Sequence, residues 1–253
     1  MIGWLNPRRQ LAPPRYPASP SGVTLYAVGD VHGRIDCLQR AQAAIDRDRS
    51  YLHRSQRALE IYVGDYIDRG PASPAVIDNL IARAAQTELV TLRGNHEILM
   101  TSFLSGELAF EQWRGLGGLE TVMAYGVSPL RLRENGWMAP SDLAARAPPA
   151  HLAFLASLQT HFVCGPYCFV HAGLRPGVPL AQQAERDFAW IRGEFLDYRG
   201  GFEHIIVHGH TPVRDIEFHP FRINIDTGAY LSNKLSVLCI DQSGPAALRE
   251  EVE

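Results

Sequence analysis

The 253-residue chain has few cysteines and no long apolar run. Four cysteines are too few to build a disulfide framework in a chain of this length. We expect buried or inert thiols, because a free cysteine usually packs as a small hydrophobic residue; the alternative is that Cys164 and Cys168 form half of a metal site. No apolar stretch approaches the ~20 residues that a membrane-spanning helix requires, so we expect no membrane partner.

An excess of basic residues is also missing, since the net charge is −3. Proteins that bind nucleic acid usually carry a basic patch, so we expect no nucleic acid among the partners. After Met1 to Leu5 the chain turns to proline and arginine, without the apolar segment and cleavage site of a secretory signal. We therefore expect a cytoplasmic protein.

The first 22 residues contain five prolines among arginine and serine. Such a composition predicts an extended arm outside the core over residues 1–22, which could fold back through Trp4 and Leu5. No linker-like stretch interrupts the remainder, so residues 23–253 are predicted to form one catalytic domain.

Short apolar runs alternate with helical patterns in the first part of that domain. Strands are predicted at residues 23–28, 59–63 and 89–92, and helices at 36–48 and 74–85. This order is typical of parallel βαβ units in an α/β sheet. The middle of the chain, residues 97–158, is predicted to be a helical insertion. Further strands are predicted at residues 161–164, 168–170, 205–208, 222–225 and 235–240.

Five predicted strands end in polar segments that are rich in glycine, aspartate and histidine. Any one of these segments could be an ordinary turn, but the presence of all five in this order indicates a functional site. The carboxyl ends of neighbouring strands in an α/β sheet meet at one edge, so the segments can bring their polar side chains together. The segments are Gly29-Asp30-Val31-His32-Gly33, Gly64-Asp65-Tyr66-Ile67-Asp68-Arg69-Gly70, Gly94-Asn95-His96-Glu97, Phe169-Val170-His171-Ala172-Gly173 and Val207-His208-Gly209-His210-Thr211.

Carboxylate, imidazole and amide side chains together suit a pair of divalent metal ions. Two ions about 3.5–4 Å apart need a shared anionic bridge, for which Asp65 is suitable. Mixed ligands of this kind favour Mn, Fe or Zn over calcium, with Mn as the first choice. Two such ions lower the pKa of a water molecule and stabilise the oxygens of a phosphoryl transfer.

The complete motif set resembles the phosphoprotein phosphatases of the metallophosphoesterase superfamily, most of all the short bacterial and phage serine/threonine phosphatases. The resemblance spans residues 23–240 and implies an α/β fold in which two β-sheets form a sandwich flanked by helices. Pro212 stands where the wider superfamily often has another histidine, which agrees with the phosphatase branch. Residues 224–230 do not match the long loop of the eukaryotic enzymes, so sensitivity to their natural-product inhibitors is not expected.

The resemblance also implies a role for each site residue. Asp30 and His32 would bind the first metal ion, and Asp65 would bridge both ions. The second ion would be held by Asn95, His171 and His210. His96 would be the general acid, oriented by Asp68, and Arg69 and Arg192 would hold the phosphate oxygens.

Several neighbouring residues can be read in two ways. His208 is expected to fill a strand, with an outer role at the metal site as the alternative. Arg93 is expected to form an ion pair with an acid, although it could touch phosphate. Glu97 is expected either at the N-terminus of a helix or as a carboxylate that supports the metal ligands without binding a metal ion. Trp113 and the glycine-rich residues 115–118 are expected to pack in the insertion, with a substrate lid as the alternative.

These observations predict a metal-dependent phosphomonoesterase that acts on phosphoserine and phosphothreonine in proteins, and also on small phosphoesters. The first alternative is a dinucleoside polyphosphate hydrolase, whose members usually lack an acid at the position of Asp68. A different class of alternative is a non-catalytic binding module. The full ligand set and the Asp68–His96 pair argue against that module.

Overall fold

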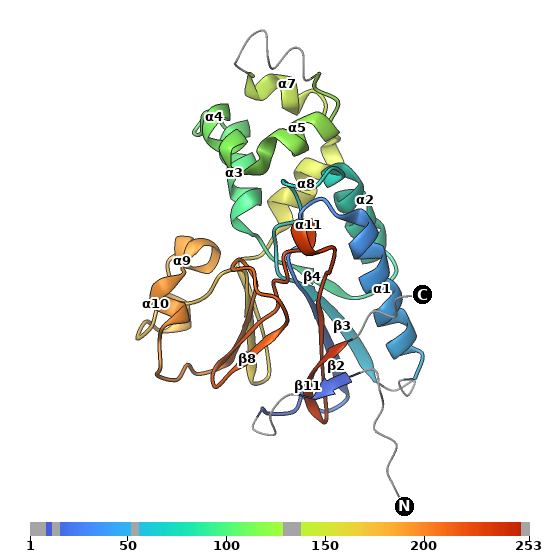
Figure 1. The fold of residues 1–253 in the computed structure, drawn as a ribbon, viewed down its shortest axis with the longest axis vertical. Coiled ribbons are helices and arrows are strands. Elements are labelled where there is room, and N and C mark those ends of the chain that lie inside the picture. Colours follow the sequence, from blue (N-terminus) through green and yellow to red (C-terminus); the bar gives the residue numbers. More distant parts are fainter. Residues whose placement is uncertain (1–8, 12–15, 52–55, 129–137, 249–253) are drawn as a thin grey trace, which may run out of the picture.

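The computed structural model describes residues 9–11, 16–51, 56–128 and 138–248. Two β-sheets lie at its centre, and helices cover the outer face of each (Figure 1). The expected α/β architecture with two sheets flanked by helices is therefore confirmed.

The first sheet has six strands, in the order β1-β11-β10-β2-β3-β4. β2, β3 and β4 run parallel, as the βαβ pattern predicted. β10 and β11 complete the sheet as antiparallel strands, and β1 of the arm is the outermost strand beside β11. The bounds are β1 (Arg9–Leu11), β2 (Val23–Val28), β3 (Arg57–Tyr62), β4 (Leu89–Thr91), β10 (Val237–Asp241) and β11 (Gly244–Leu248).

The second sheet has five strands, in the order β5-β6-β7-β9-β8. β6, β7 and β9 run parallel, so their carboxyl ends share one edge. The bounds are β5 (His161–Cys164), β6 (Tyr167–Val170), β7 (Ile205–His208), β8 (Glu217–His219) and β9 (Arg222–Asn224).

The side chains of β2 show how the layers are assembled. Leu25 and Ala27 point into the core between the sheets, where they join Phe169 of the second sheet. Tyr26 and Val28 point the opposite way, into the core beneath the helices. This alternation follows from the two-residue period of a strand, and it explains why a strand buried on both faces reads as a continuous apolar run.

Helices cover three regions of the molecule. α1 and α2 lie on the outer face of the first sheet, and α9 and α10 cover the second (Figure 1). Between β4 and β5 the described residues are largely helical, as expected for the insertion. The bounds are α1 (Ile35–Arg49), α2 (Ser73–Ala84), α3 (Asn95–Leu104), α4 (Phe110–Trp113), the π-helix η1 (Arg114–Gly118), α5 (Leu119–Ala124), α7 (Pro140–Ala144), α8 (Pro149–Ser157), the 3-10 helix η2 (Leu180–Gln182), α9 (Glu185–Trp190), α10 (Gly193–Leu196) and α11 (Ala229–Ser232).

Three strands and part of the arm differ from the expectation. β1, β8 and β11 were not predicted: β1 lies in the proline-rich arm, β8 is only three residues long, and β11 begins with Gly-Pro, which disfavours a strand. In the arm, the Pro17 carbonyl accepts a bond of 2.5 Å from Tyr167 Oη, and the Ser19 N–H donates to Asp241 at 3.0 Å. Trp4 and Leu5 lie outside the described residues, and the boundary at residue 22 stays a prediction.

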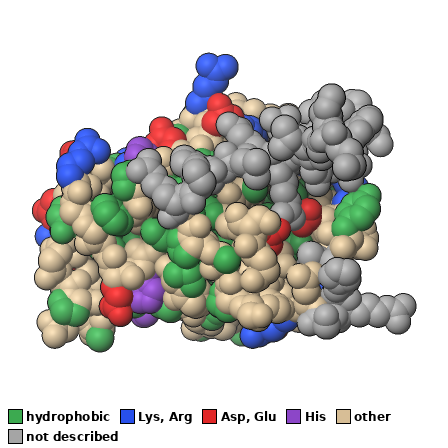
Figure 2. Space-filling model, turned by 90° about the horizontal axis from the view of Figure 1, so that it is seen from below, with side chains coloured by type: hydrophobic (Ala, Val, Ile, Leu, Met, Phe, Trp, Pro, Cys, Tyr) green, Lys and Arg blue, Asp and Glu red, His purple; other side chains and the backbone are tan. Residues whose placement is uncertain are grey.

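The surface and the cysteines agree with the composition. On the described part of the face in Figure 2, basic side chains are scattered among acidic ones and do not gather in one patch. None of the described helices has the length and apolarity needed to cross a membrane. All four cysteines are free thiols, and burial raises the pKa of Cys168 to about 12, which makes it unreactive.

Candidate metal centre

Asp65 lies at the centre of the site, just after β3, and is only 2% exposed. Its Oδ2 atom lies 3.5 Å from His32 Nε2 and 3.4 Å from His171 Nε2. The first histidine follows β2 of one sheet, and the second follows β6 of the other. A methyl group on Gly94 would lie 2.1 Å from Asp65 Oδ1, so only glycine permits this packing. One carboxylate thus faces imidazoles from both sheets, as a bridging ligand would.

The orientation of His32 is fixed by a backbone carbonyl. Its Nδ1 atom lies 2.9 Å from the carbonyl oxygen of Ile67. Because a carbonyl only accepts hydrogen bonds, Nδ1 carries the proton and the lone pair of Nε2 faces Asp65. The donor atoms of His32, Asp65 and His96 lie within 4.8 Å of one another, which is close enough to share one ion.

Asp30 contributes a buried oxygen that lacks a hydrogen-bond partner. Its Oδ2 atom accepts the His210 backbone N–H at 2.9 Å, whereas Oδ1 is buried and unpaired. Burial and the charges of Asp226 and Asp65 raise the pKa of Asp30 well above its usual range. An unpaired buried carboxylate oxygen is costly, and a cation would remove that cost. The residues present therefore fit a metal ion.

The second group of donors lies on the other side of Asp65. His171 Nε2 is 3.0 Å from Asn95 Oδ1 and 3.2 Å from His210 Nδ1. His171 Nδ1 faces the Val63 carbonyl at 3.0 Å, which leaves the Nε2 lone pair directed into the site. Donor atoms of Asp65, His171 and His210 lie within 4.8 Å of one another, as required for a second ion.

The histidines of both groups are in the form that binds metals. Burial lowers the pKa of His32 to about 3 and that of His210 to about 2, and it also lowers the pKa of His171. All three imidazoles are therefore neutral at pH 7, which is the state a metal ligand needs.

His96 and Asp68 form a buried pair next to Asp65. His96 Nδ1 lies 2.7 Å from Asp68 Oδ2, and the two side chains are at most 1% exposed. Burial alone would lower the pKa of His96, but the charges of Asp65 and Asp68 and the bond to Asp68 raise it above its usual value. A protonated, oriented imidazole is suited to give its proton to a leaving oxygen.

The helical insertion holds Asp68 in place. Trp113 Nε1 donates to Asp68 Oδ2 at 2.7 Å, and Thr121 Oγ1 donates to Asp68 Oδ1 at 2.6 Å. Trp113 also packs on Phe103 with 5.3 Å between ring centroids, so the expected packing is confirmed. Neither the hydrogen bond from Trp113 nor the contribution of Thr121 was predicted, because no local sequence pattern links the insertion to Asp68.

The two arginines predicted to hold phosphate contact opposite sides of the site. Arg69 Nη1 lies 3.1 Å from His32 Nε2, and Arg192 Nε donates to His210 Nε2 at 2.9 Å. At His32 the Nε2 lone pair can serve the guanidinium or a cation, but not both, whereas at His210 the guanidinium contacts Nε2 and Nδ1 faces the second group of donors. Arg69 is further held over the ring of Tyr230, 4.7 Å from the centroid.

The structure brings all predicted site residues into one cluster, while their individual roles stay predictions. Asp226 and Tyr230 also belong to this cluster but were not singled out. Asp226 follows β9 at the same sheet edge, is 2% exposed, and burial raises its pKa to about 6. The signal was present, because an aspartate after a predicted strand is the pattern of the other segments.

The residues with two interpretations can now be placed. His208 is fully buried in β7 against the ring of Phe195, which confirms it as strand filling. Arg93 forms an ion pair of 3.0 Å with Glu185, as expected. Glu97 accepts backbone N–H bonds at Gly94, at Asp65 and at the residue that follows, so it supports the segment that carries Asp65.

Backbone strain is concentrated at the same site. Among the described residues, most of the non-glycine residues with positive φ are predicted site residues. Such conformations cost about 1–3 kcal/mol each and persist where the surrounding structure enforces them, often at functional sites. The strained site residues are His32 (φ 45°), Asp65 (53°), Asp68 (69°), Arg69 (65°) and His210 (66°).

Known proteins with related sequences are named as dinucleotide hydrolases. The chain is 28% identical over 230 residues to a bis(5'-nucleosyl)-tetraphosphatase PrpE (asymmetrical) of Oceanobacillus iheyensis, which covers 83% of this chain and 85% of that protein. It is 27% identical over 234 residues to the protein of the same name from Anoxybacillus flavithermus, covering 83% and 88%. These names agree with the alternative expectation and not with the finer resemblance to phosphoprotein phosphatases.

Two solved structures share the fold. A crystal structure described as a "putative diadenosine tetraphosphatase" superposes with a TM-score of 0.62 at 18% identity, over 94% of this chain and 98% of that one. A cold-active protein tyrosine phosphatase superposes with a TM-score of 0.57 at 17% identity, over 95% and 82%. Residues 23–237 match the family described as Calcineurin-like phosphoesterase, which is most of the chain. The chain therefore belongs to the calcineurin-like phosphoesterase family.

Proposed function

We propose that this protein is a metal-dependent hydrolase of dinucleoside polyphosphates that uses two divalent ions, with Mn²⁺ as the first candidate. The main support for a metal centre is the buried Asp65 carboxylate, whose Oδ2 atom lies within 3.5 Å of an imidazole nitrogen from each sheet. His32 and Asp30 would complete one site. Asn95 with His171 and His210 would complete the other.

The substrate class is supported by the names of the related proteins, which are asymmetrical tetraphosphatases. Bound divalent ions would lower the pKa of a water molecule and stabilise charge on the phosphoryl group. Side chains of the protein would bind the phosphate and supply the proton for the leaving group. Arg69 and Arg192 would bind phosphate oxygens from opposite sides, and His96 would give a proton to the departing oxygen.

A second candidate function is hydrolysis of phosphoserine and phosphothreonine in proteins. The Asp68–His96 pair at 2.7 Å favours it, because an alkoxide leaves poorly unless it is protonated. The departing phosphate chain of a dinucleotide needs less help from an acid. The Asp68–His96 pair is thus compatible with both substrate classes, but it would accelerate the hydrolysis of a phosphomonoester more.

Turnover of the two substrate classes separates these functions. Purified protein with added MnCl₂ is given diadenosine tetraphosphate or a phosphoserine peptide, and the products are resolved by chromatography. We expect ATP and AMP from the dinucleotide, with a kcat/KM at least about 100-fold above that for the peptide, which corresponds to roughly 3 kcal/mol in transition-state binding. A higher kcat/KM on the peptide would favour the protein phosphatase. Turnover of neither substrate, by a protein that binds Mn²⁺, would favour a binding module.

A further inference from the structure

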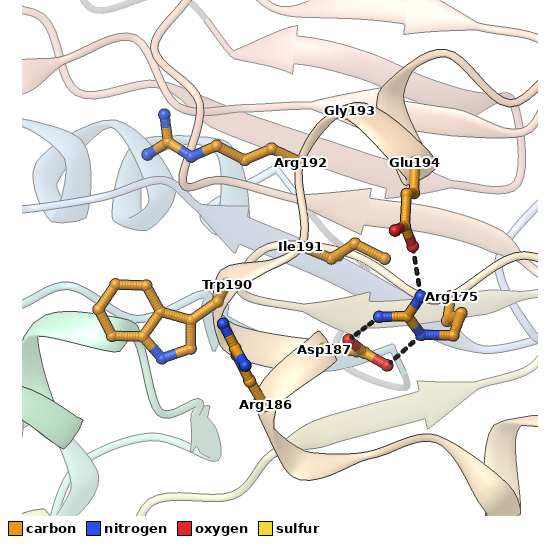
Figure 3. Close-up of a pocket in the computed structure, with 8 residues that line it drawn as sticks. All are labelled: Arg175, Arg186, Asp187, Trp190, Ile191, Arg192, Gly193 and Glu194. Atoms are coloured by element: carbon orange, nitrogen blue, oxygen red, sulfur yellow. Dashed lines mark hydrogen bonds and ion pairs between the residues drawn. The ribbon is translucent and has the colours of Figure 1, made fainter.

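A pocket of about 330 Å³ lies beside the candidate metal centre, and Arg192 is common to both. Its walls come mainly from α9, α10 and the turn between them, with Arg175 from the loop that follows β6 (Figure 3). Arg192 belongs to both places, because it lines this pocket and donates to His210 at the metal centre. Arg192 is thus positioned to contact a ligand that spans the metal centre and the pocket. We call it the Trp190 pocket.

The three arginines of the Trp190 pocket differ in what they already bind. Arg175 is engaged with Asp187 at 2.8 and 2.9 Å and also with Glu194 (Figure 3). Arg192 is engaged with His210. Arg186 is exposed and has no hydrogen-bond or ion-pair partner within the described ranges. The guanidinium of Arg186 is therefore the one available to an anionic ligand.

Trp190 supplies an aromatic surface between the pocket and the metal centre. Its side chain is partly exposed and lines the pocket, and its ring centroid lies 6.4 Å from that of His210. A partly exposed indole beside an unpaired guanidinium matches the needs of a nucleotide, which has a flat base and charged phosphates.

Contacts with the core hold this wall in place. The Phe188 carbonyl in α9 accepts the Ala172 N–H at 2.7 Å, and the Phe188 ring stacks on His161 with centroids 4.8 Å apart. Arg93, just after β4, pairs with Glu185 at the start of α9. The pocket is thus positioned before any ligand binds, which reduces the entropic cost of binding.

We propose that the Trp190 pocket binds one nucleoside end of a dinucleoside polyphosphate, an inference that rests on the proposed function. The base stacks on Trp190, and the phosphates beyond the scissile one reach Arg186. The pocket volume is at the lower end of that usual for small-molecule sites, as expected for a single nucleoside. A phosphoserine peptide or a small aryl phosphate has no nucleobase that could stack on Trp190.

The test compares Trp190→Leu and Arg186→Gln with Arg47→Gln as the matched control. Arg47 is an exposed arginine in the last turn of α1, far from α9 in Figure 1. The readout is the ratio of kcat/KM for diadenosine tetraphosphate to kcat/KM for para-nitrophenyl phosphate. We expect each pocket variant to lower this ratio roughly 5- to 100-fold, the range expected for one lost base stack or one lost charged contact. The control is expected to keep the ratio of the parent enzyme.

Calorimetric binding of ATP to the same variants provides a second readout that needs no turnover. We expect the Kd for ATP to rise by a similar factor in both pocket variants. If the parent enzyme cleaves diadenosine tetraphosphate and both variants keep its ratio and Kd, the pocket assignment is wrong while the proposed function stands. If the parent enzyme cleaves only para-nitrophenyl phosphate, the proposed function fails and the Kd values for ATP test the pocket by themselves. A higher Kd in the two variants than in the parent enzyme supports a nucleotide site, and equal Kd values reject it. Arg186→Gln changes an exposed side chain, so it keeps the test valid if Trp190→Leu does not fold.

Discussion

His96 is held between two carboxylates, and this arrangement determines which of its nitrogens can donate. Nδ1 faces Asp68 at 2.7 Å, while the backbone N–H of His96 donates to Asp65 Oδ1 at 3.1 Å. Nε2 is therefore the atom left to face the reacting group. Because Nε2 also lies 3.9 Å from Asp65 Oδ2, His96 could instead bind a metal ion together with His32. The two roles, general acid and metal ligand, predict different effects of a substitution at His96.

His96→Asn is expected to keep both metal ions and to lower kcat by roughly 10²–10⁴-fold on alkyl phosphates, the usual contribution of a positioned general acid. The loss is expected to be much smaller on para-nitrophenyl phosphate, because a nitrophenolate leaves readily without a proton. Metal content by elemental analysis and kcat on both substrates provide the measurement. A lost equivalent of metal, or equal losses on both substrates, would assign His96 as a ligand and not as the acid.

At the scale of elements, the insertion between β4 and β5 holds Asp68 and Arg69 in place. Trp113 and Thr121 hold the carboxylate of Asp68, and the carbonyl of Gly117 accepts the backbone N–H of Arg69 at 3.0 Å. Gly117 has a φ of 107°, and a methyl group there would lie 2.7 Å from Arg69 Cγ. The kink at Gly117 between α4 and α5 is thus shaped to fit against the arginine.

Gly117→Ala is expected to destabilise the protein by roughly 1–3 kcal/mol, because alanine tolerates this φ poorly and contacts Arg69. In a protein of this size that corresponds to a Tm about 2–10 °C lower. We also expect a lower kcat/KM, since Arg69 must shift. Gly115→Ala is the matched control, as a methyl group at Gly115 meets no atom within 4 Å. The measurements are the Tm and the kcat/KM of both variants. Equal values for Gly117→Ala and Gly115→Ala would contradict the role of Gly117 in positioning Arg69.

At the scale of the whole molecule, the metal centre lies where the two sheets meet. Asp30 and Asp65 belong to the ends of β2 and β3, whereas His171 and His210 follow β6 and β7 of the other sheet. A ligand that binds only the folded state stabilises it by a free energy that grows with the logarithm of its free concentration relative to its Kd. Metal ions at this place would therefore join the sheets as well as serve catalysis.

Removal of metal is expected to lower the Tm and to abolish turnover. At a free Mn²⁺ concentration of about 100 times its Kd, binding contributes about 2.7 kcal/mol, which corresponds to a Tm shift of roughly 5–10 °C. The measurement is thermal unfolding after dialysis against EDTA and again after stepwise addition of MnCl₂. We expect Tm and activity to recover together, with saturation near two ions per chain. A Tm and an activity that do not respond to metal would reject the centre described here.

Much of this architecture could be predicted because its signals are local. A buried parallel strand is a short apolar run, and the polar residues after it must lie at the sheet edge, so Asp30, Asp65 and His171 could be assigned to one place. β8 and β11 could not be predicted, since their residues have little strand preference and their pairing partners supply the stabilisation.

Local sequence patterns were enough to predict which polar side chains form this set, because aspartate, asparagine and histidine after successive strands have few other uses in combination. The residues that surround that set depend instead on tertiary packing. The hydrogen bonds from Trp113 and Thr121 to Asp68, and the pocket between Trp190 and Arg186, join residues that no sequence period brings together. Such contacts depend on how helices pack on the sheets, and packing is a property of the whole chain and not of any segment within it.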